Sequence, residues 1–287
     1  MIKSEIFEKF FLALPTVTEY HAPGTPLYNF LKDVMRQEAE NLFRQKKKQA
    51  VKFPPFGELN FPYHKMGAID TLNLFDLDEL IIFSFYWQNR SKYRKVLDIG
   101  ANLGLHSIIL SKCGYSVNSY EPDCLHFKIL KENLGLNNIS KVKPYNMAVA
   151  DKDGIVDFIR VLDNTTGSHI VGSKPNPYGK LEMVSVKTSA FKKILKGFDL
   201  VKMDVEGFEK TIIVSTDKGD WKDMDGLLSV HDVENAKVLF KHFSDLGVNL
   251  FSQKVGWRKA VCVKDMPMNH YEGSLFVSTK KKMPWLG

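Results

Sequence analysis

The sequence predicts an α/β protein built on a doubly wound, mostly parallel sheet. From residue 95 onward, short apolar strands alternate with segments of helical spacing, a pattern typical of βαβ units. A sheet of this kind is covered by helices on both faces. The expected strands cover 95–100, 116–122, 142–149, 199–205 and 226–232, with closing strands near 248–252, 259–264 and 274–278. The expected helices cover 103–113, 123–134, a segment after Gly207, and 233–246.

Residues 1–73 are expected to form a helical extension beside a main domain at 74–287. Apolar residues recur near helical spacing from 26 to about 50, which predicts an amphipathic helix that suits a homodimer face as well as a cap. The segment 52–65 is rich in proline and aromatic residues and reads as a connector. A further helix is expected at 76–88.

Composition indicates a soluble, cytoplasmic protein. Apolar residues make up 44% of the chain, and the longest apolar run, 80–87, is far shorter than a membrane span. The N-terminus lacks a signal-peptide pattern. Cys113, Cys124 and Cys262 have no metal-binding spacing, so we expect them to be reduced and buried.

The formal net charge is +7, and its excess lies after residue 90. A basic surface favours anionic partners such as phosphorylated or nucleotide-linked sugars, or nucleic acid. No basic stretch interleaved with aromatic residues points to nucleic acid, and a solvated lysine-rich surface is the simpler interpretation. We therefore expect a small-molecule or glycan partner.

The segment VLDIGANLGLHS passes from a strand through a tight turn into a helix. Gly100, Asn102 and Gly104 form G-x-N-x-G, which differs from the G-x-G-x-x-G pattern of nicotinamide binders. Glu121 ends the next strand, where a carboxylate can accept both hydroxyls of a ribose. This combination favours a nucleoside without a pyrophosphate. S-adenosylmethionine fits, with Asp98 near its cationic methionine part.

Other polar residues have competing interpretations. Asn146 and Ala148 follow the third strand, where an adenine ring would lie, yet a polar strand end explains Asn146 nearly as well. Asn133 is about equally well explained as a site residue and as a helix C-cap before Gly135. Lys202 reads as a surface residue of the fourth strand, and His169 as a solvated loop residue.

Several motifs together resemble the FkbM-like S-adenosylmethionine-dependent methyltransferases. The resemblance covers about residues 74–278 and is carried by VLDIGANLGLHS, SYEPD, KENLGLNN, NMAVADKDG, TGSH and LVKMDVEGFE in that order. It implies a class I methyltransferase fold, with seven strands of which one is antiparallel. It also implies O-methylation of a hydroxyl, most often on a sugar. The family often has an acidic residue before the histidine of the fifth strand, where Ser229 stands here.

Two acidic clusters are candidates for the methyl-transfer chemistry. The motif MDVEGFE places Asp204, Glu206 and Glu209 at the end of the fourth strand and into the next helix. The motif VHDVEN places His231, Asp232 and Glu234 at the end of the fifth strand. Adjacent parallel strands bring these ends together. We expect His231 to act as the general base or to orient the acceptor, with Asp204 and Glu206 as its partners. Acids at a helix start also stabilise the helix dipole. A divalent cation on Asp204, Glu206 and Asp232 is a variant.

Two other functions stay open at this stage. One is a methyltransferase that acts on RNA or protein. The other is a non-catalytic module that binds nucleic acid or a partner protein and keeps a relict pocket. The intact set of Asp98, Gly100, Gly104 and Glu121 favours an enzyme, because a module without a cofactor has no need of that carboxylate.

Overall fold

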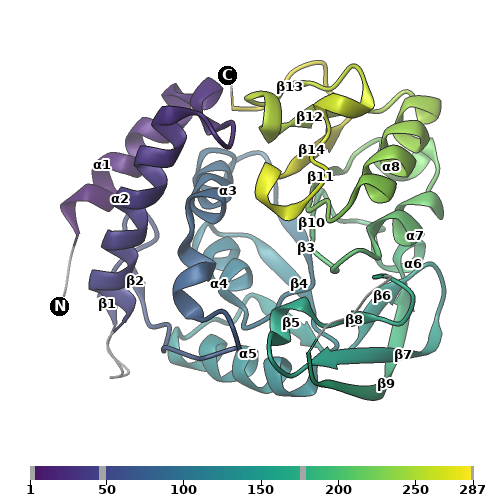
Figure 1. Cartoon of the computed structure of the whole chain (residues 1–287), viewed down its shortest axis with the longest axis horizontal. Coiled ribbons are helices and arrows are strands. Elements are labelled where there is room, and N and C mark those ends of the chain that lie inside the picture. Colours follow the sequence, from purple (N-terminus) through teal and green to yellow (C-terminus); the bar gives the residue numbers. More distant parts are fainter. Residues whose placement is uncertain (1–3, 45–49, 175–178, 286–287) are drawn as a thin grey trace.

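An eight-stranded mixed sheet forms the centre of the structure (Figure 1). The computed structural model describes residues 4–44, 50–174 and 179–285. The strand order is β13-β12-β14-β11-β10-β3-β4-β5. The strands are β3 (Lys95–Ile99), β4 (Ser116–Tyr120), β5 (Val142–Tyr145), β10 (Leu200–Met203), β11 (Asp225–Leu228), β12 (Asn249–Ser252), β13 (Arg258–Lys259) and β14 (Leu275–Ser278).

The sheet is parallel from β5 to β11, and β14 is antiparallel to both of its neighbours. This agrees with the expected class I arrangement except for one extra strand. The two-residue β13 pairs antiparallel with β12, so the expected strand at 259–264 is much shorter than predicted. The reason is local, because the chain turns into a 3₁₀ helix at Val263–Asp265.

Helices cover both faces of the sheet, as the sequence pattern predicted. Alternate strand residues point to opposite faces. Val96 and Leu200 pack in one apolar cluster, whereas Leu97 and Val201 pack in another. Residues from α3 (Leu77–Gln88), α4 (Leu105–Lys112) and α5 (Cys124–Leu136) belong to the first cluster. Residues from α6 (Phe191–Ile194), α7 (Glu209–Val214) and α8 (Val233–Leu246) belong to the second, on the other face.

A second sheet of four strands was not predicted. The expected strand at 142–149 is interrupted: its first part is β5, and its last residues start β6, which leaves the main sheet and pairs with β9. The four strands have the order β6-β9-β7-β8. They are β6 (Ala148–Ala150), β7 (Gly154–Val161), β8 (His169–Ile170) and β9 (Leu181–Ala190). Short 3₁₀ helices are η1 (Leu14–Thr16), η2 (Thr18–His21), η3 (Thr71–Phe75), η4 (Thr165–Gly167), η5 (Lys218–Trp221), η6 (Gln253–Val255), η7 (Val263–Asp265) and η8 (His270–Glu272).

The N-terminal segment packs against the main sheet domain through an aromatic cluster. Its elements are α1 (Glu5–Ala13), α2 (Pro26–Phe43) and the hairpin of β1 (Val51–Lys52) with β2 (Glu58–Leu59). Figure 1 shows α1 and α2 on the outer side of α3. The fully buried Phe53 ring lies between other phenylalanine rings, with centroid distances of 5.2 to 5.8 Å. Helix α2 is shorter than the predicted 26–50, and positions 45–49 lie outside the described residues.

The cysteines only partly follow the expectation of burial. Cys113 is buried, but Cys124 and Cys262 are exposed, and all three are free thiols. Cys124 starts α5 and Cys262 precedes η7, and the first residues of such surface elements face solvent. None of the described helices has the length and apolar character needed to span a membrane.

We expect Phe53→Ala to lower the free energy of unfolding by about 3–5 kcal/mol, because truncation removes a buried ring and leaves a cavity. Chemical denaturation followed by circular dichroism measures the change. Phe30→Ala is the matched control, since the Phe30 side chain on α2 is 61% exposed. Equal losses in both variants would show that the aromatic cluster does not hold the N-terminal segment in place.

Candidate active site

The main cavity opens at the carboxyl ends of the parallel strands and has a volume of about 620 Å³. Gly100 and Asn102 line it after β3, Glu121 after β4, Asp204 after β10 and His231 after β11. This is the position expected for a ligand site in a doubly wound sheet. The N-terminal segment and α3 form another part of its wall.

Gly100 is required by the close approach of two strand ends. Its φ is +77°, and a Cβ atom there would lie 1.8 Å from the carbonyl oxygen of Asp204. Gly104 has a different role from the expected one, because its added Cβ would meet Cγ of Leu130 at 2.9 Å. Gly104 does not line the cavity and instead lets α4 start close to α5.

Glu121 is buried, and its carboxyl group fixes the backbone of the turn after β3 through hydrogen bonds. Its Oε2 accepts from the backbone N–H of Asn102 at 2.7 Å, and its Oε1 accepts from the N–H of Asp123 at 2.8 Å. Burial raises the pKa of Glu121 to about 8, although these two N–H donors oppose the shift. A carboxylate oxygen has more than one lone pair, so Glu121 can also accept from ribose hydroxyls.

Asp98 and Lys202 form a buried pair next to the cavity. Ser107 Oγ donates to Asp98 Oδ2 at 2.6 Å, and Lys202 Nζ lies 3.9 Å from Asp98 Oδ1. Lys202 is only 8% exposed and lines the cavity, so the prediction of a surface residue is wrong. The parallel register that sets Lys202 opposite Asp98 explains its burial. Asp98 itself is fully buried and does not line the cavity.

The asparagines separate into one cavity residue and two structural residues. The Asn102 backbone has a φ of +51°, and its buried Oδ1 has no hydrogen-bond partner within the described chain. Asn146 Nδ2 donates to the carbonyls of Glu121 and Pro122, which supports its interpretation as a polar strand end. Asn133 Nδ2 donates to the Leu103 carbonyl, so this side chain braces the turn and is not a helix cap. Ala148, beside Asn146, lines the cavity.

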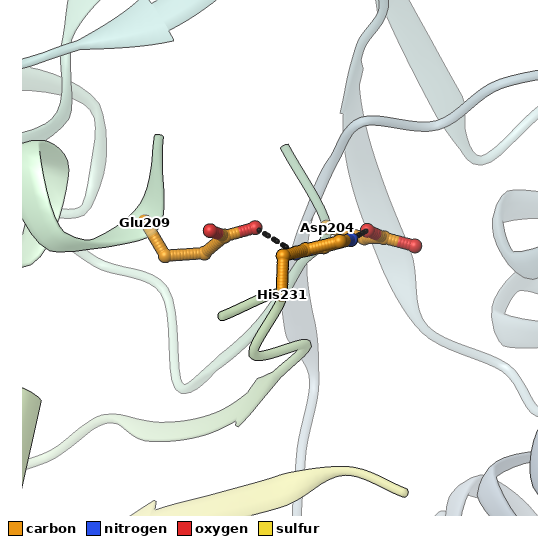
Figure 2. Close-up of side chains that lie close together, drawn as sticks. All are labelled: Asp204, Glu209 and His231. Carbon is orange, nitrogen blue, oxygen red and sulfur yellow. Dashed lines mark ion pairs between the residues drawn. The ribbon is translucent and has the colours of Figure 1, made fainter. Parts of the chain in front are cut away.

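His231 lies between carboxylates that come from the neighbouring strand end (Figure 2). Its Nε2 is 3.3 Å from Asp204 Oδ1 and 3.7 Å from Glu206 Oε2, and its Nδ1 is 3.0 Å from Glu209 Oε1. Glu209 is fully buried, and its Oε1 also accepts from the N–H of Val205. The sequence named Asp204 and Glu206 as the partners of His231 and placed Glu209 in the same acidic cluster, but only the structure shows that Glu209 contacts the ring.

Opposing charges set the pKa values of this cluster. Burial alone would lower the pKa of His231, but Glu209, Glu206 and Asp204 raise it well above its usual range. Burial alone would raise the pKa of Asp204, but Lys202 and His231 outweigh it and hold that pKa below the usual range. Near neutral pH, His231 is therefore an imidazolium ring beside the ionised carboxylate of Asp204.

The predicted metal set of Asp204, Glu206 and Asp232 does not form. The Asp232 side chain caps α8 by accepting from the Asn235 N–H, and Asp232 does not line the cavity. Lys174 pairs with Glu206 instead. The residues whose ligand atoms lie within 4.8 Å of one another are Asp204, Glu209 and His231.

His169 differs from its expected place in a solvated loop. It is 1% exposed and pairs with β7 as part of β8. Its Nδ1 lies 2.9 Å from the Gly167 carbonyl oxygen. The second sheet, which the sequence pattern did not predict, causes this burial.

Glu79 and His106 are among the cavity residues that the sequence analysis missed. Glu79 lies in the first turn of α3, where an acid also suits the helix dipole, and His106 lies within the motif that follows β3. His106 Nε2 is 2.8 Å from Glu79 Oε2. The position of His106 in the first turn of α4, two residues after Gly104, was the signal that could have placed it near the site.

The residues present fit S-adenosylmethionine. Asn102 offers an unsatisfied acceptor at the cavity, Glu121 offers a carboxylate at the strand end, and the turn at Gly100 keeps side chains out of the way. The site has no phosphate-binding loop of the G-x-G-x-x-G type. With the order of the main sheet and its antiparallel β14, this site defines the class of S-adenosylmethionine-dependent methyltransferases.

Residues 98–262, more than half of the chain, match the sequence model of the methyltransferase FkbM domain. The chain belongs to the FkbM methyltransferase family. None of the curated proteins compared with the chain matches it.

Solved structures of other methyltransferases are distantly similar to this chain. The ribosomal protein L11 methylase from Lactobacillus delbrueckii subsp. bulgaricus is 13% identical, with a TM-score of 0.40 over 71% of this chain and 78% of that chain. An O-methyltransferase from Bacillus cereus in complex with SAH is 12% identical, with a TM-score of 0.37 over 68% of this chain and 77% of that chain. The functional assignment rests on the family match and on the site.

We expect S-adenosylhomocysteine to bind about tenfold more tightly at pH 9 than at pH 7. A pKa of about 8 for Glu121 leaves only a minor fraction of its carboxyl ionised at pH 7, and ribose hydroxyls donate best to the ionised form. Calorimetric titration across this pH range measures the change.

Glu121→Gln should weaken binding at pH 9 and remove most of the pH dependence. Between pH 4.5 and about 8 the unfolded chain has lost the proton of Glu121 while the folded protein still holds it, so the free energy of unfolding of the wild type should fall with rising pH relative to that of Glu121→Gln. Glu132→Gln, at an exposed position of α5, is the control. The same pH dependence in all three proteins would exclude Glu121 as its source.

Proposed function

We propose that this chain is an O-methyltransferase that methylates a hydroxyl group of a sugar, a glycan or a glycosylated small molecule. The observation that carries the proposal is the carboxylate of Asp204, held at the cavity by His231 and Lys202. S-adenosylmethionine, when bound, supplies a methyl carbon that is activated by the adjacent sulfonium. The chain must then orient a hydroxyl and accept its proton.

Asp204 is the residue best placed to accept that proton. Its side chain is 32% exposed and lines the cavity, whereas Glu209 is fully buried. A hydroxyl oxygen becomes much more acidic as it forms its third bond, to the methyl carbon, while the bond from that carbon to the sulfonium sulfur breaks. A carboxylate of low pKa is therefore a sufficient base for the hydroxyl proton. The ionised state of Asp204 also keeps it an acceptor of hydrogen bonds from the hydroxyl.

The sequence left two roles open for His231, general base and orienting group. In this proposal His231 is the orienting group. Both of its ring nitrogens face carboxylates, so neither offers a free lone pair to a substrate. Glu209 fixes the ring from the buried side, and the ring in turn fixes Asp204. Glu206 is held by Lys174 and completes the acidic side of the cavity.

A divalent cation is the alternative way to activate the hydroxyl. Asp204, Glu209 and His231 could offer one ligand atom each. Such an ion would have to replace the proton that His231 holds between its carboxylates. Methyl transfer that is unaffected by EDTA would support the proton-transfer arrangement over the metal.

The proposal is tested with S-adenosylmethionine and a panel of methyl glycosides, a structured RNA and a mixture of unmodified proteins. We expect release of S-adenosylhomocysteine with the glycosides only, and a new O-methyl signal in the NMR spectrum of the product. Methylation of the RNA or protein instead would establish the runner-up function. Binding of S-adenosylhomocysteine without methylation of any acceptor would support the non-catalytic module.

Asp204→Asn should lower kcat by ~10²-fold or more and leave the affinity for S-adenosylhomocysteine nearly unchanged, because the amide cannot accept the proton. His231→Gln should also lower kcat, since Asp204 loses its orienting partner. Asp223→Asn, at an exposed position outside the site, is the control. Full activity of Asp204→Asn would place the base elsewhere.

A further inference from the structure

A second acid–histidine pair, Glu79 with His106, lines the same cavity. Glu79 comes from α3 and His106 from α4, and both line the cavity with Asp204 and His231. The Glu79 side chain is 33% exposed, whereas that of His106 is 12% exposed. Glu79 therefore presents a carboxylate to the cavity while its histidine partner lies deeper.

A buried hydrogen-bond chain fixes this pair. The carboxylate of Glu79 can only accept, so His106 Nε2–H donates to Glu79 Oε2 at 2.8 Å. In the neutral ring, Nδ1 then accepts from the hydroxyl of Tyr86 at 3.0 Å. Tyr86 is completely buried. A carboxylate whose only role is to stabilise the helix dipole of α3 does not need hydrogen bonds from a histidine that is itself held by a tyrosine. The arrangement therefore indicates that Glu79 is held in a defined orientation.

Lys202 interacts electrostatically with both the Asp204 and the Glu79 carboxylates. Burial opposes its charge, but Asp204, Asp98 and Glu79 together raise its pKa. His106 in turn helps to lower the pKa of Asp204. Glu79 and His106 therefore lie in the same cavity as Lys202 and Asp204 and within electrostatic reach of them.

The cavity is poor in free positive charge although the whole chain is basic. Acidic lining residues outnumber lysines, and each lining lysine already pairs with an acid. Lys32 Nζ lies 2.9 Å from Asp76, Lys174 pairs with Glu206, and Lys202 lies 3.9 Å from Asp204. A phosphate group on the acceptor would have to break one of these pairs. The cavity therefore suits an uncharged acceptor, in contrast to the anionic partner that the net charge favoured.

We propose that the acceptor is an uncharged polyol and that Glu79, positioned by His106, accepts a hydrogen bond from a hydroxyl that neighbours the one held by Asp204. This inference rests on the proposed O-methyltransferase function and adds the substrate class and a specificity-determining residue. The two carboxylates bind two hydroxyls of one ring, and the pair of contacts selects which hydroxyl meets the methyl group.

Steady-state kinetics with methyl hexopyranosides, their monodeoxy derivatives and their phosphate esters tests the proposal. Glu79→Gln should raise KM for the best glycoside by ~10-fold or more and leave kcat within about twofold, because a hydrogen bond to a charged acceptor is lost. Removing the neighbouring hydroxyl should raise KM in the wild type but have little further effect in Glu79→Gln. Glu234→Gln is the matched control, since Glu234 occupies the first turn of α8 and is exposed.

The possible outcomes separate this inference from the proposed function. A lower KM for phosphate esters, or an unchanged KM and unchanged deoxy-sugar discrimination in Glu79→Gln, would overturn the inference alone. Methylation of no glycoside would overturn both. Saturation-transfer NMR measures the direct binding of the glycosides to the protein loaded with S-adenosylhomocysteine. Glu79→Gln should bind the best glycoside more weakly than the wild type, and equal affinity in the two proteins would contradict the inference.

Discussion

The parallel pairing of β3 with β10 is the constraint on which the rest of the site depends. It sets Lys202 opposite Asp98 and brings the turn at Gly100 against the backbone of Asp204. A side chain at position 100 would separate the two strand ends. The turn proposed to contact the cofactor and the strand end that carries the proposed base are therefore packed directly against each other.

The charged side chains at these strand ends are buried or half-buried, so each one depends on a neighbour of opposite charge for its stabilisation. Lys202 lies between Asp98 and Asp204, and His231 lies between Asp204 and Glu209, so each ionised group has a partner of opposite sign. Removing one partner would leave a buried charge without compensation, which is more costly than the pair is stabilising. Such a network holds Asp204 in one orientation and lets it face the cavity as a carboxylate.

The N-terminal segment contributes both to the core and to the substrate side of the cavity. Its aromatic residues belong to the same apolar cluster as Val96 and α4. Lys32, Ile69 and Asn73 of this segment line the cavity. The same packing that completes the core thus determines the wall that an acceptor would contact.

By itself, the sequence determined the order of strands and helices in the main sheet, the turn at Gly100, and the convergence of Asp204 and His231, because these follow from periodicity and from the geometry of parallel strand ends. The folded chain alone decided the features that depend on contacts distant in sequence. The second sheet buries His169, the strand register buries Lys202, and the packing of α3 on α4 joins Glu79 to His106. Periodicity reports which face of an element is apolar but not which polar residue of another element will lie against it, so these pairings follow only from the tertiary structure.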